Sequence, residues 1–515
     1  MKIKRIKIHN IPHKPLIDGL DISFPDSINY NSLNTNCLIG VNGSGKSQFL
    51  ESIADLFVYL DSLYRNCNKP KTTSSPFLFD ILYFIIHNNK KYTVNIIQEK
   101  PNKLPLFIVK NEIGKEIQLK GKEYDLYLPA KIIGYTSGEN ETLSIPFLAY
   151  YDEYAEYTAG RAIHGYNSTD YEPRFYFMDY STNLGIVISN LIFEEFEGVE
   201  KLKKELNITQ IKSFQIIIQT NSPAAPKMPI KGETGVILTE ELKQWRDFLI
   251  STATCYEFEE KLNRYTLDFY FNKATKDAFT HFFKSAYNLY TALYKLELLN
   301  NLMIDKAVRK NIEKDRRNRN LINKMPSVPN KDKVLHYSEL KLMLQNGQTV
   351  DYLSLSDGEH QYFNIFGSII MVNHDNSLFL LDEPETHFNP KWRRLFISHL
   401  RSLTKDRKQD LYLTSHSPFI VSDCPRDNVY IFKRIENKRI EIKNPSQETF
   451  GASFDNILQM AFGMDEVISK EASDKIKELH EETDPNIIEQ ELTKLGDSPQ
   501  LLPLYRRIDM LSQNK

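Results

Sequence analysis

Residues 40 to 47 have the types and spacing that hold a triphosphate. They read Gly-Val-Asn-Gly-Ser-Gly-Lys-Ser, a complete G-x-x-x-x-G-K-S pattern that follows an apolar stretch. Glycines here let backbone N–H groups turn toward phosphate oxygens, and a helix that begins at the lysine adds the positive end of its dipole. We predict that this loop binds ATP, with Lys46 at the β- and γ-phosphates and Ser47 as a ligand of Mg²⁺. The predicted ATP-binding residues of the loop are Gly40, Asn42, Gly43, Ser44, Gly45, Lys46 and Ser47.

Two adjacent carboxylates follow a second apolar stretch. Residues 377–384 read Ser-Leu-Phe-Leu-Leu-Asp-Glu-Pro, which predicts a buried strand that ends in Asp382 and Glu383. Phosphoryl transfer depends mainly on positioning and charge stabilisation. We therefore expect Asp382 to hold Mg²⁺ and Glu383 to orient and polarise the attacking water. Alone, the pattern fits an acidic turn after a strand; together with residues 40–47 it indicates a nucleotide site.

Two further motifs resemble parts of ABC ATPases. Residues 355–359, Leu-Ser-Asp-Gly-Glu, resemble the ABC signature LSGGQ, and residues 411–418 end a strand in His416, as the ABC switch loop does. At a helix start, the Ser356 hydroxyl and the Gly358 N–H can bind an anion, although the same serine also caps the helix. The resemblance implies that Ser356 and Gly358 bind the γ-phosphate held by a second protomer. It also implies that His416 is catalytic alongside Glu383.

The order of these four motifs along the chain is the ABC order. The stretch DEPETHFNP at 382–390 resembles the branch that contains SMC, RecF and the overcoming-lysogenization-defect proteins. This implies a D-loop around Thr386–Pro390, with His387 or Asn389 near the dimer seam. The loop SGENE at 137–141 has the position of a Q-loop, but it contains no glutamine.

The sequence also resembles a narrower group, the AAA-family, restriction-system-associated ATPases of anti-phage defence. That group includes the PtuA ATPase of Septu systems and of Septu-bearing retrons. The segments that carry the resemblance are LPAKIIGYTSGENE, DYLSLSDGEHQ, LLDEPETHFNPKWR, LTSHSPFIVSDC and TFGASFDNIL. They imply ATP and Mg²⁺ as ligands and a head-to-head homodimer or a larger oligomer of dimers. They also imply a sensor or regulator that controls a separately encoded HNH-type nuclease.

The chain lacks the marks of an effector of its own. The stretch after His416 is shorter than a Toprim domain usually needs, and it has neither an Asp-x-Asp pair nor a His-Asn-His set. We therefore expect ATPase activity and no nuclease activity. DNA, or msDNA with its reverse transcriptase in a retron, is a further candidate partner. The basic run Lys306–Lys324 can track phosphates, but a solvated helix face or a partner-docking surface fits it slightly better.

Composition narrows the class further. Apolar residues make up 41% of the chain and the formal net charge is −2, so no global field draws it to nucleic acid or membrane. The four cysteines show no Cys-x-x-Cys spacing, which argues against a zinc hook and suits a reducing cytoplasm. The apolar stretch Phe77–Ile86 is too short to span a bilayer and contains Asp80. We expect a cytoplasmic protein without a membrane partner.

Predicted strands and predicted helices alternate along the chain around the motifs, and this pattern indicates a parallel core sheet. We expect an α/β fold: an ABC-type P-loop ATPase head with an antiparallel β subdomain, a helical insertion and a C-terminal helical tail. Residues 334–355 predict a hairpin that turns at Asn346-Gly347. The expected units are the N-terminal half of the head (1–146), a mixed and helical insertion (147–330), the C-terminal half of the head (331–450) and a helical region (451–515). Two other functions stay open: a RecF-like DNA repair or maintenance ATPase, and an ATP-dependent assembly scaffold.

Overall fold

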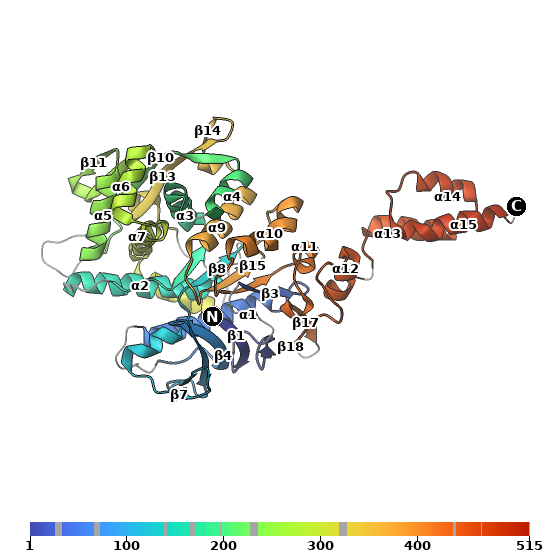
Figure 1. The fold of residues 1–515 in the computed structure, drawn as a ribbon, viewed down its shortest axis with the longest axis horizontal. Helices are drawn as coiled ribbons and strands as arrows, with labels where there is room; N and C mark the ends of the chain where they lie inside the picture. The colour runs from blue at the N-terminus through green and yellow to red at the C-terminus, as the bar shows by residue number, and fades with distance from the viewer. Residues whose placement is uncertain are drawn as a thin grey trace.

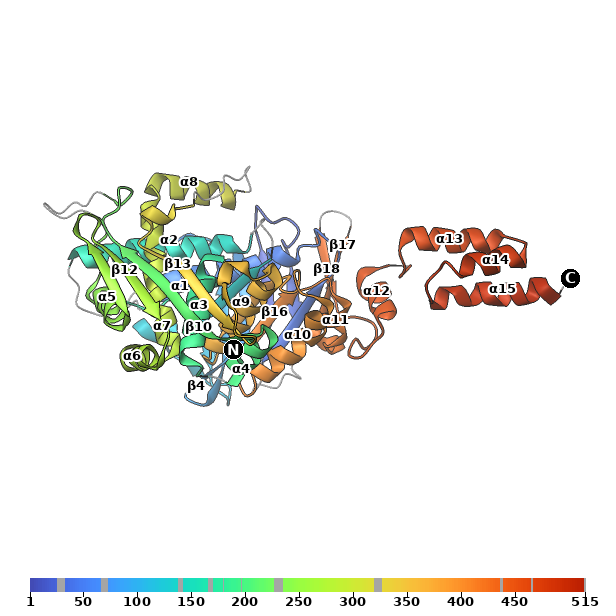
Figure 2. The same cartoon turned by 90° about the horizontal axis from the view of Figure 1, so that it is seen from above.

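The computed structural model describes residues 1–25, 33–65, 73–137, 142–164, 170–178, 180–195, 197–226, 235–318, 327–435, 439–464 and 466–513. These residues form three sheets and the helices that pack on them (Figures 1 and 2). One continuous apolar core joins the three sheets. No helix in the described ranges is long and apolar enough to cross a membrane.

The central sheet carries the strands that the motifs predict. Its strand order is β18-β17-β3-β16-β15-β8-β9, and every neighbouring pair is parallel except β17 with β18. The strands are β3 (Asn34–Ile39), β8 (Ile132–Thr136), β9 (Phe175–Met178), β15 (Leu378–Asp382), β16 (Asp410–Thr414), β17 (Val429–Ile435) and β18 (Arg439–Lys443). Because parallel strands end at one edge, β3, β15 and β16 bring their motifs together there. The predicted α/β P-loop head is confirmed.

The second sheet is antiparallel throughout, in the order β2-β1-β4-β5-β6-β7. Its strands are β1 (Lys2–His9), β2 (Asp21–Ser23), β4 (Leu78–His87), β5 (Lys90–Gln98), β6 (Leu106–Lys110) and β7 (Glu116–Ile117). Alternating residues of β4 are buried, because one face of the strand meets the core. This is the predicted antiparallel subdomain, at the bottom of Figure 1.

The third sheet supplies the strands of the insertion that the sequence predicts to be mixed and helical. Its order is β11-β12-β10-β13-β14, formed by β10 (Ile208–Gln219), β11 (Cys255–Glu259), β12 (Arg264–Tyr270), β13 (Leu335–Leu344) and β14 (Thr349–Asp351). The β13–β14 hairpin is confirmed, but it extends a sheet whose other strands lie before residue 330. Packing favours β10 as a strand, since alternate residues in its second half, Phe214, Ile216 and Ile218, are buried and the strand contacts α3 and α4. The boundaries at 146, 330 and 450 stay predictions.

Helices cover the faces of the sheets. They are α1 (Lys46–Tyr64), α2 (Ser144–His164), α3 (Tyr180–Phe193), α4 (Glu197–Glu205), α5 (Glu240–Thr252), α6 (Lys273–Phe283), α7 (Ala286–Leu298), α8 (Lys306–Arg317), α9 (Asp357–Met371), α10 (Pro390–Leu403), α11 (Pro418–Ser422) and α12 (Phe454–Phe462). Helix α1 packs on β15 and β16, whereas α3, α5 and α7 pack on the third sheet. The helix that starts at Lys46 and the helix that starts after Ser356 therefore both rest on buried sheet.

The chain ends in a separate helical unit. Its helices are α13 (Lys470–Glu481), α14 (Pro485–Leu492) and α15 (Leu502–Gln513), and Figure 1 shows them set apart at one end of the molecule. They share a small core of their own, made of Ile476, Leu479, Ile488, Leu492, Leu501 and Leu504. The predicted C-terminal helical tail is confirmed.

Candidate nucleotide-binding and hydrolysis site

The loop at 40–47 connects the end of β3 to the start of α1. Gly40 has a φ of 142°, and a Cβ there would lie 2.3 Å from the carbonyl oxygen of Phe432. Gly45 has a φ of 91°, and its Cβ would lie 2.3 Å from Cδ1 of Ile440. A side chain at Gly40 would be excluded both by backbone conformation and by the backbone of Phe432, whereas at Gly45 the backbone conformation is the main obstacle, because the terminal methyl of Ile440 can move. The path of the loop between β17 and β18 on one side and α1 on the other therefore requires glycine.

Lys46 lies at the centre of the site. Its Nζ donates to the carbonyl oxygen of Gly40 at 2.8 Å and lies 3.2 Å from Nε2 of His416. Burial lowers the pKa of the Lys46 ammonium, and the carboxylates of Glu383 and Asp382 partly offset that effect. A buried ammonium between a P-loop carbonyl and the switch histidine is placed to meet a polyanion.

Asp382 ends β15 beside Thr414, its register partner at the end of β16. The hydroxyls of Ser47 and Thr414 both donate to Oδ1 of Asp382, at 3.0 Å and 2.6 Å. Burial raises the pKa of the Asp382 carboxyl, and these two hydrogen bonds oppose the rise. The register of β15 with β16 thus sets the position of Asp382, the predicted Mg²⁺ carboxylate. Its hydrogen bond from Ser47 joins it to the predicted Mg²⁺ hydroxyl.

Glu383 occupies a strained position directly after the strand. Its φ is 50°, in the left-handed region that non-glycine residues rarely adopt, and its N–H donates to Oγ1 of Thr414 at 2.9 Å. The carboxyl oxygen Oε1 lies 3.5 Å from Nε2 of His416. The hydrogen bond from His416 lowers the pKa of the Glu383 carboxyl. The unusual backbone turns this carboxylate out of the sheet toward Lys46 and His416.

The residues present fit ATP with Mg²⁺. The hydroxyl of Ser44 is buried and makes no hydrogen bond within the described part of the chain. It therefore offers a donor inside the loop, next to the start of α1 and the ammonium of Lys46. The hydroxyl of Ser47 and the carboxylate of Asp382 are the hard oxygen ligands that Mg²⁺ prefers.

The signature residues lie at the start of α9, away from this cluster. Ser356 is exposed and caps the helix in a box with Glu359, whose Oε2 accepts from the Ser356 N–H at 2.8 Å. A Cβ on Gly358 would lie 2.7 Å from the carbonyl oxygen of His387. Among the described residues, the Ser356 hydroxyl and N–H bond to Glu359, the Ser356 carbonyl oxygen accepts from the N–H of His360, and none of these bonds goes to residues 40–47. The structure brings Lys46, Ser47, Asp382, Glu383 and His416 together, and leaves Ser356 and Gly358 outside that group.

Three polar residues of the site were missed by the sequence reading: Thr414, Gln361 and Glu385. Each lies inside one of the motifs described above, but its hydrogen-bond partner becomes known only from strand pairing or helix packing in the structure. The register of β15 with β16 places Thr414 beside Asp382, and this is a signal that the strand ends themselves contain. The other two depend on the turn between β15 and α10, which no local pattern describes.

The structure describes the predicted D-loop and the start of the predicted Q-loop, and both assignments stay predictions. The side chain of Asn389 accepts from the N–H of Trp392 at 2.9 Å and caps α10. Thr386 donates to Ser137, at the start of the predicted Q-loop, at 3.0 Å. Residues 138–141 of that loop lie outside the described residues. Their role as a Q-loop stays a prediction.

The basic run from Lys306 is partly used inside the molecule. Arg309 is buried and pairs with Asp152 at 2.6 Å and Glu156 at 2.7 Å, and Lys306 pairs with Glu156 at 2.6 Å. These bonds fasten α8 along α2, as Figure 2 shows. Arg319 and Lys324 lie outside the described residues, as do the side chains of Arg316 and Arg317. The exposed cations that the structure describes in this run include Lys310 and Lys314.

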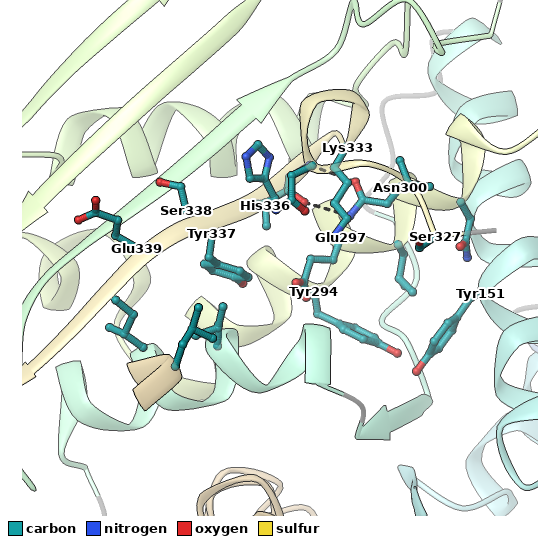
Figure 3. A pocket seen from close by; sticks show the side chains of 18 of the residues that line it. Tyr151, Tyr294, Glu297, Asn300, Ser327, Lys333, His336, Tyr337, Ser338 and Glu339 are labelled. Carbon is teal, nitrogen blue, oxygen red and sulfur yellow. Dashed lines mark hydrogen bonds between the residues drawn. The ribbon is translucent and has the colours of Figure 1, made fainter. Parts of the chain in front are cut away.

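A cavity of about 580 Å³ opens away from the P-loop. Figure 3 shows its walls, with Tyr151 of α2, Tyr294 of α7 and Tyr337 of β13 among them. The described residues that line it include none of 40–47, and neither Asp382, Glu383 nor His416. Its edge includes residues 351–353, directly before the signature motif. The cavity is therefore separate from the cluster around Lys46.

Comparison with protein families gives one match. Residues 207–422 match the family described as "AAA domain, putative AbiEii toxin, Type IV TA system". That range includes the signature, the Asp382-Glu383 pair and His416, and it begins after the P-loop. Among curated proteins, Protein ea59 of Escherichia phage lambda is 27% identical over 110 residues. That match spans 21% of this chain and 21% of ea59, about a fifth of its length.

Solved structures of SMC head domains also align with the chain. The SMC head domain from Thermotoga maritima is 10% identical, with a TM-score of 0.30; the alignment covers 87% of this chain and all of that one. A Pyrococcus furiosus Smc head domain, bound to the C-terminal domain of ScpA, is 12% identical with a TM-score of 0.31, over 86% of this chain and 96% of that one. TM-scores of this size add nothing to the fold, which rests on the strand order and loop positions above.

Proposed function

We propose, from the AAA-family ATPase domain that this chain carries, that it binds ATP with Mg²⁺ and hydrolyses the γ-phosphate bond. The observation that supports this is the meeting of Lys46, Ser47, Asp382, Glu383 and His416 at the ends of β3, β15 and β16.

Each group in the site has a proposed role. The backbone and side chains of the loop hold the phosphates, through Gly40, Asn42, Gly43, Ser44, Gly45 and Lys46. Mg²⁺, held by Ser47 and Asp382, supplies charge that neutralises the β- and γ-phosphates. Glu383 accepts a proton from the attacking water, and His416 contacts the γ-phosphate.

Hydrolysis in this proposal takes place in a head-to-head dimer. Ser356 is exposed at the positive end of α9 and has no hydrogen bond to its own P-loop among the described residues. It is therefore free to meet the γ-phosphate of a second protomer, together with the N–H of Gly358. ATP favours the closed dimer and hydrolysis opens it, because the ligand binds the closed state more tightly.

The dimer is proposed to act in the cytoplasm as a sensor and regulator of an anti-phage system, with a separately encoded HNH-type nuclease as effector. The description of the matching family as a toxin of a toxin–antitoxin system, and the partial similarity to a phage protein, are compatible with that setting. The tail α13–α15 offers a docking surface, since Leu502, Tyr505 and Met510 are exposed apolar side chains on α15.

The test is purification of the chain alone and with its gene neighbours, followed by ATPase and nuclease assays. We expect the chain alone to hydrolyse ATP and to leave plasmid and single-stranded DNA intact, and a neighbouring nuclease to co-purify. Lys46→Ala is the control, because it removes the charge at the phosphates and should abolish turnover. DNA-stimulated turnover without a nuclease partner would favour the repair ATPase instead. An intact complex with no turnover would favour the scaffold.

A further inference from the structure

Glu385 is a buried carboxyl that the roles above do not use. It lies in the turn between β15 and α10, two residues after Glu383, and is only 4% exposed. Its Oε1 accepts a short hydrogen bond from the hydroxyl of Ser415, the residue before His416. Among the described residues, Oε2 of the same carboxyl has no hydrogen-bond partner. Glu385 therefore holds the switch loop through the side chain next to His416.

The switch loop is held from its other side by β3. The N–H of Ser415 donates to the carbonyl oxygen of Leu38 at 3.1 Å, and the N–H of Ser417 donates to the Ser415 hydroxyl at 2.9 Å. The backbone of His416 thus lies between the strand that leads into the P-loop and the carboxyl of Glu385. Its imidazole points to the catalytic groups, 3.5 Å from Glu383 and 3.2 Å from Lys46.

The turn that carries Glu385 is also tied to the signature helix and to β8. Gln361 of α9 donates to the carbonyl oxygen of Pro384 at 2.8 Å. Thr386 donates to Ser137 at the end of β8 at 3.0 Å. A shift of α9 or β8 would therefore move Glu385 as well, and with it the backbone of His416.

If Glu385 served only the stability of the fold, a neutral acceptor would suit this buried position better than a carboxyl group. Burying an ionised carboxyl costs free energy, and a buried serine hydroxyl can be satisfied by a neutral acceptor. Burial raises the pKa of the Glu385 carboxyl to about 7, and the hydrogen bond from Ser415 opposes the rise. The carboxyl group of Glu385 therefore does not favour folding when it is charged.

We propose that Glu385 is a positioning residue that holds the backbone of His416, through the hydroxyl of Ser415, in step with the turn at 384–387. The inference rests on the proposed hydrolysis of ATP. Glu385 touches neither substrate nor metal in this proposal. It acts only by setting where the imidazole of His416 lies.

The experiment is a double-mutant cycle of Glu385→Ala with His416→Ala, measured as kcat and KM for ATP on the full chain. Glu385→Ala should lower kcat about 10-fold and change KM less than about 2-fold, because ground-state binding is untouched. When His416 is already alanine, Glu385→Ala should lower kcat by less than about 2-fold further, since both changes remove the same contribution to kcat. Glu385→Gln keeps an acceptor for Ser415 and should recover most of kcat.

If the kcat of the double variant falls by the product of the two single-variant losses, the inference is overturned. If Glu385→Ala fails to fold, Ser415→Ala removes the same hydrogen bond from the other side and takes its place in the cycle, with the same expected result. Binding of mant-ATP, a fluorescent ATP analogue, should stay within about 2-fold of wild type in every variant. Wild-type protein without turnover would overturn the proposed function itself. If wild-type protein turns over ATP and the kcat losses multiply in the double variant, only the proposed role of Glu385 is overturned.

Discussion

The side-chain amide of Gln361 accepts a 3.1 Å hydrogen bond from the backbone N–H of His387. The other end of the same amide donates to the carbonyl oxygen of Pro384 at 2.8 Å. Gln361 is on the helix that begins at the signature serine, and it is only 5% exposed. The signature helix is thus fastened directly to the turn that follows Asp382 and Glu383.

Replacing Gln361 with Met should separate the signature helix from that turn while conserving side-chain volume. The variant leaves the buried carbonyl of Pro384 without a partner, at a cost of about 1–3 kcal/mol, and removes the acceptor of the His387 N–H, which belongs to an exposed residue. We expect a lower Tm and a kcat several-fold below wild type, with KM for ATP nearly unchanged. Gln361→Glu keeps the acceptor for His387 but sets a carboxylate oxygen against the carbonyl oxygen of Pro384, so its kcat should also fall below wild type. Equal kcat in all three proteins would contradict the coupling.

Glu383→Gln should bind ATP and hydrolyse it about 10²–10⁴-fold more slowly, because it keeps the shape of the side chain and loses the basic carboxylate. The N–H of residue 383 keeps its bond to Thr414, so the strained backbone should persist. ATP should then hold the dimer closed, which light scattering after size exclusion would detect as a doubled mass. A wild-type rate in this variant would remove Glu383 from the catalytic role. Lys46→Ala serves as the matched protein that should show no ATP-dependent change in mass.

The sequence was sufficient to predict the parallel sheet and the cluster of polar residues around Lys46. The reason is that each motif combines an apolar strand with the polar residues at its end. Strand ends of a parallel sheet meet at one edge, so Lys46, Asp382 and His416 could be placed together from order alone. Strand β10 was missed because its partners lie far along the chain, in β12 and β13. Local propensity cannot report which strands will pair across such separations.

Side-chain partnerships were the other part that sequence could not supply. Thr414 became visible only through its register with Asp382, and Gln361 only through packing of α9 on the turn. Gly358 shows the same limit. The signature comparison gave it a role at a phosphate, whereas the structure also places the carbonyl of His387 against its Cα. A substitution such as Gly358→Asp would therefore disturb the turn as well as the dimer face.

Ser356→Asp compared with Ser356→Asn gives a cleaner test of the dimer face. Both residues cap a helix about as well as serine does, so α9 should persist in each. Only Asp adds a negative charge where the second protomer's γ-phosphate is proposed to lie. We expect Ser356→Asp to abolish ATP-dependent dimerisation and turnover and to keep the ATP affinity of a single protomer, while Ser356→Asn stays close to wild type.

The two capping variants need one stability control. Glu359 accepts from the N–H of residue 356, so Asp at 356 places two carboxylates near each other. On an exposed helix such repulsion costs about 0.2–0.5 kcal/mol, too little to unfold the chain. Comparable Tm values with different dimerisation would support the dimer face. Identical dimerisation in both variants would place the signature outside the interface.

The pH dependence of stability offers a test of Glu385 that does not need activity. Its folded pKa, about 7, lies above the ordinary value of 4.5, so the folded chain holds this proton more tightly than the unfolded chain does. The resulting stabilisation is fully present below pH 4.5 and is lost as pH rises through 7. By linkage the loss amounts to about 3 kcal/mol between those values. Glu385→Gln cannot lose a proton, so it should gain on wild type by that amount from pH 4.5 to pH 8 in urea unfolding. Glu489→Gln, at an exposed position of α14, is the matched control and should run parallel to wild type. Parallel curves for Glu385→Gln as well would mean that the carboxyl of Glu385 titrates in the folded chain as it does in the unfolded one.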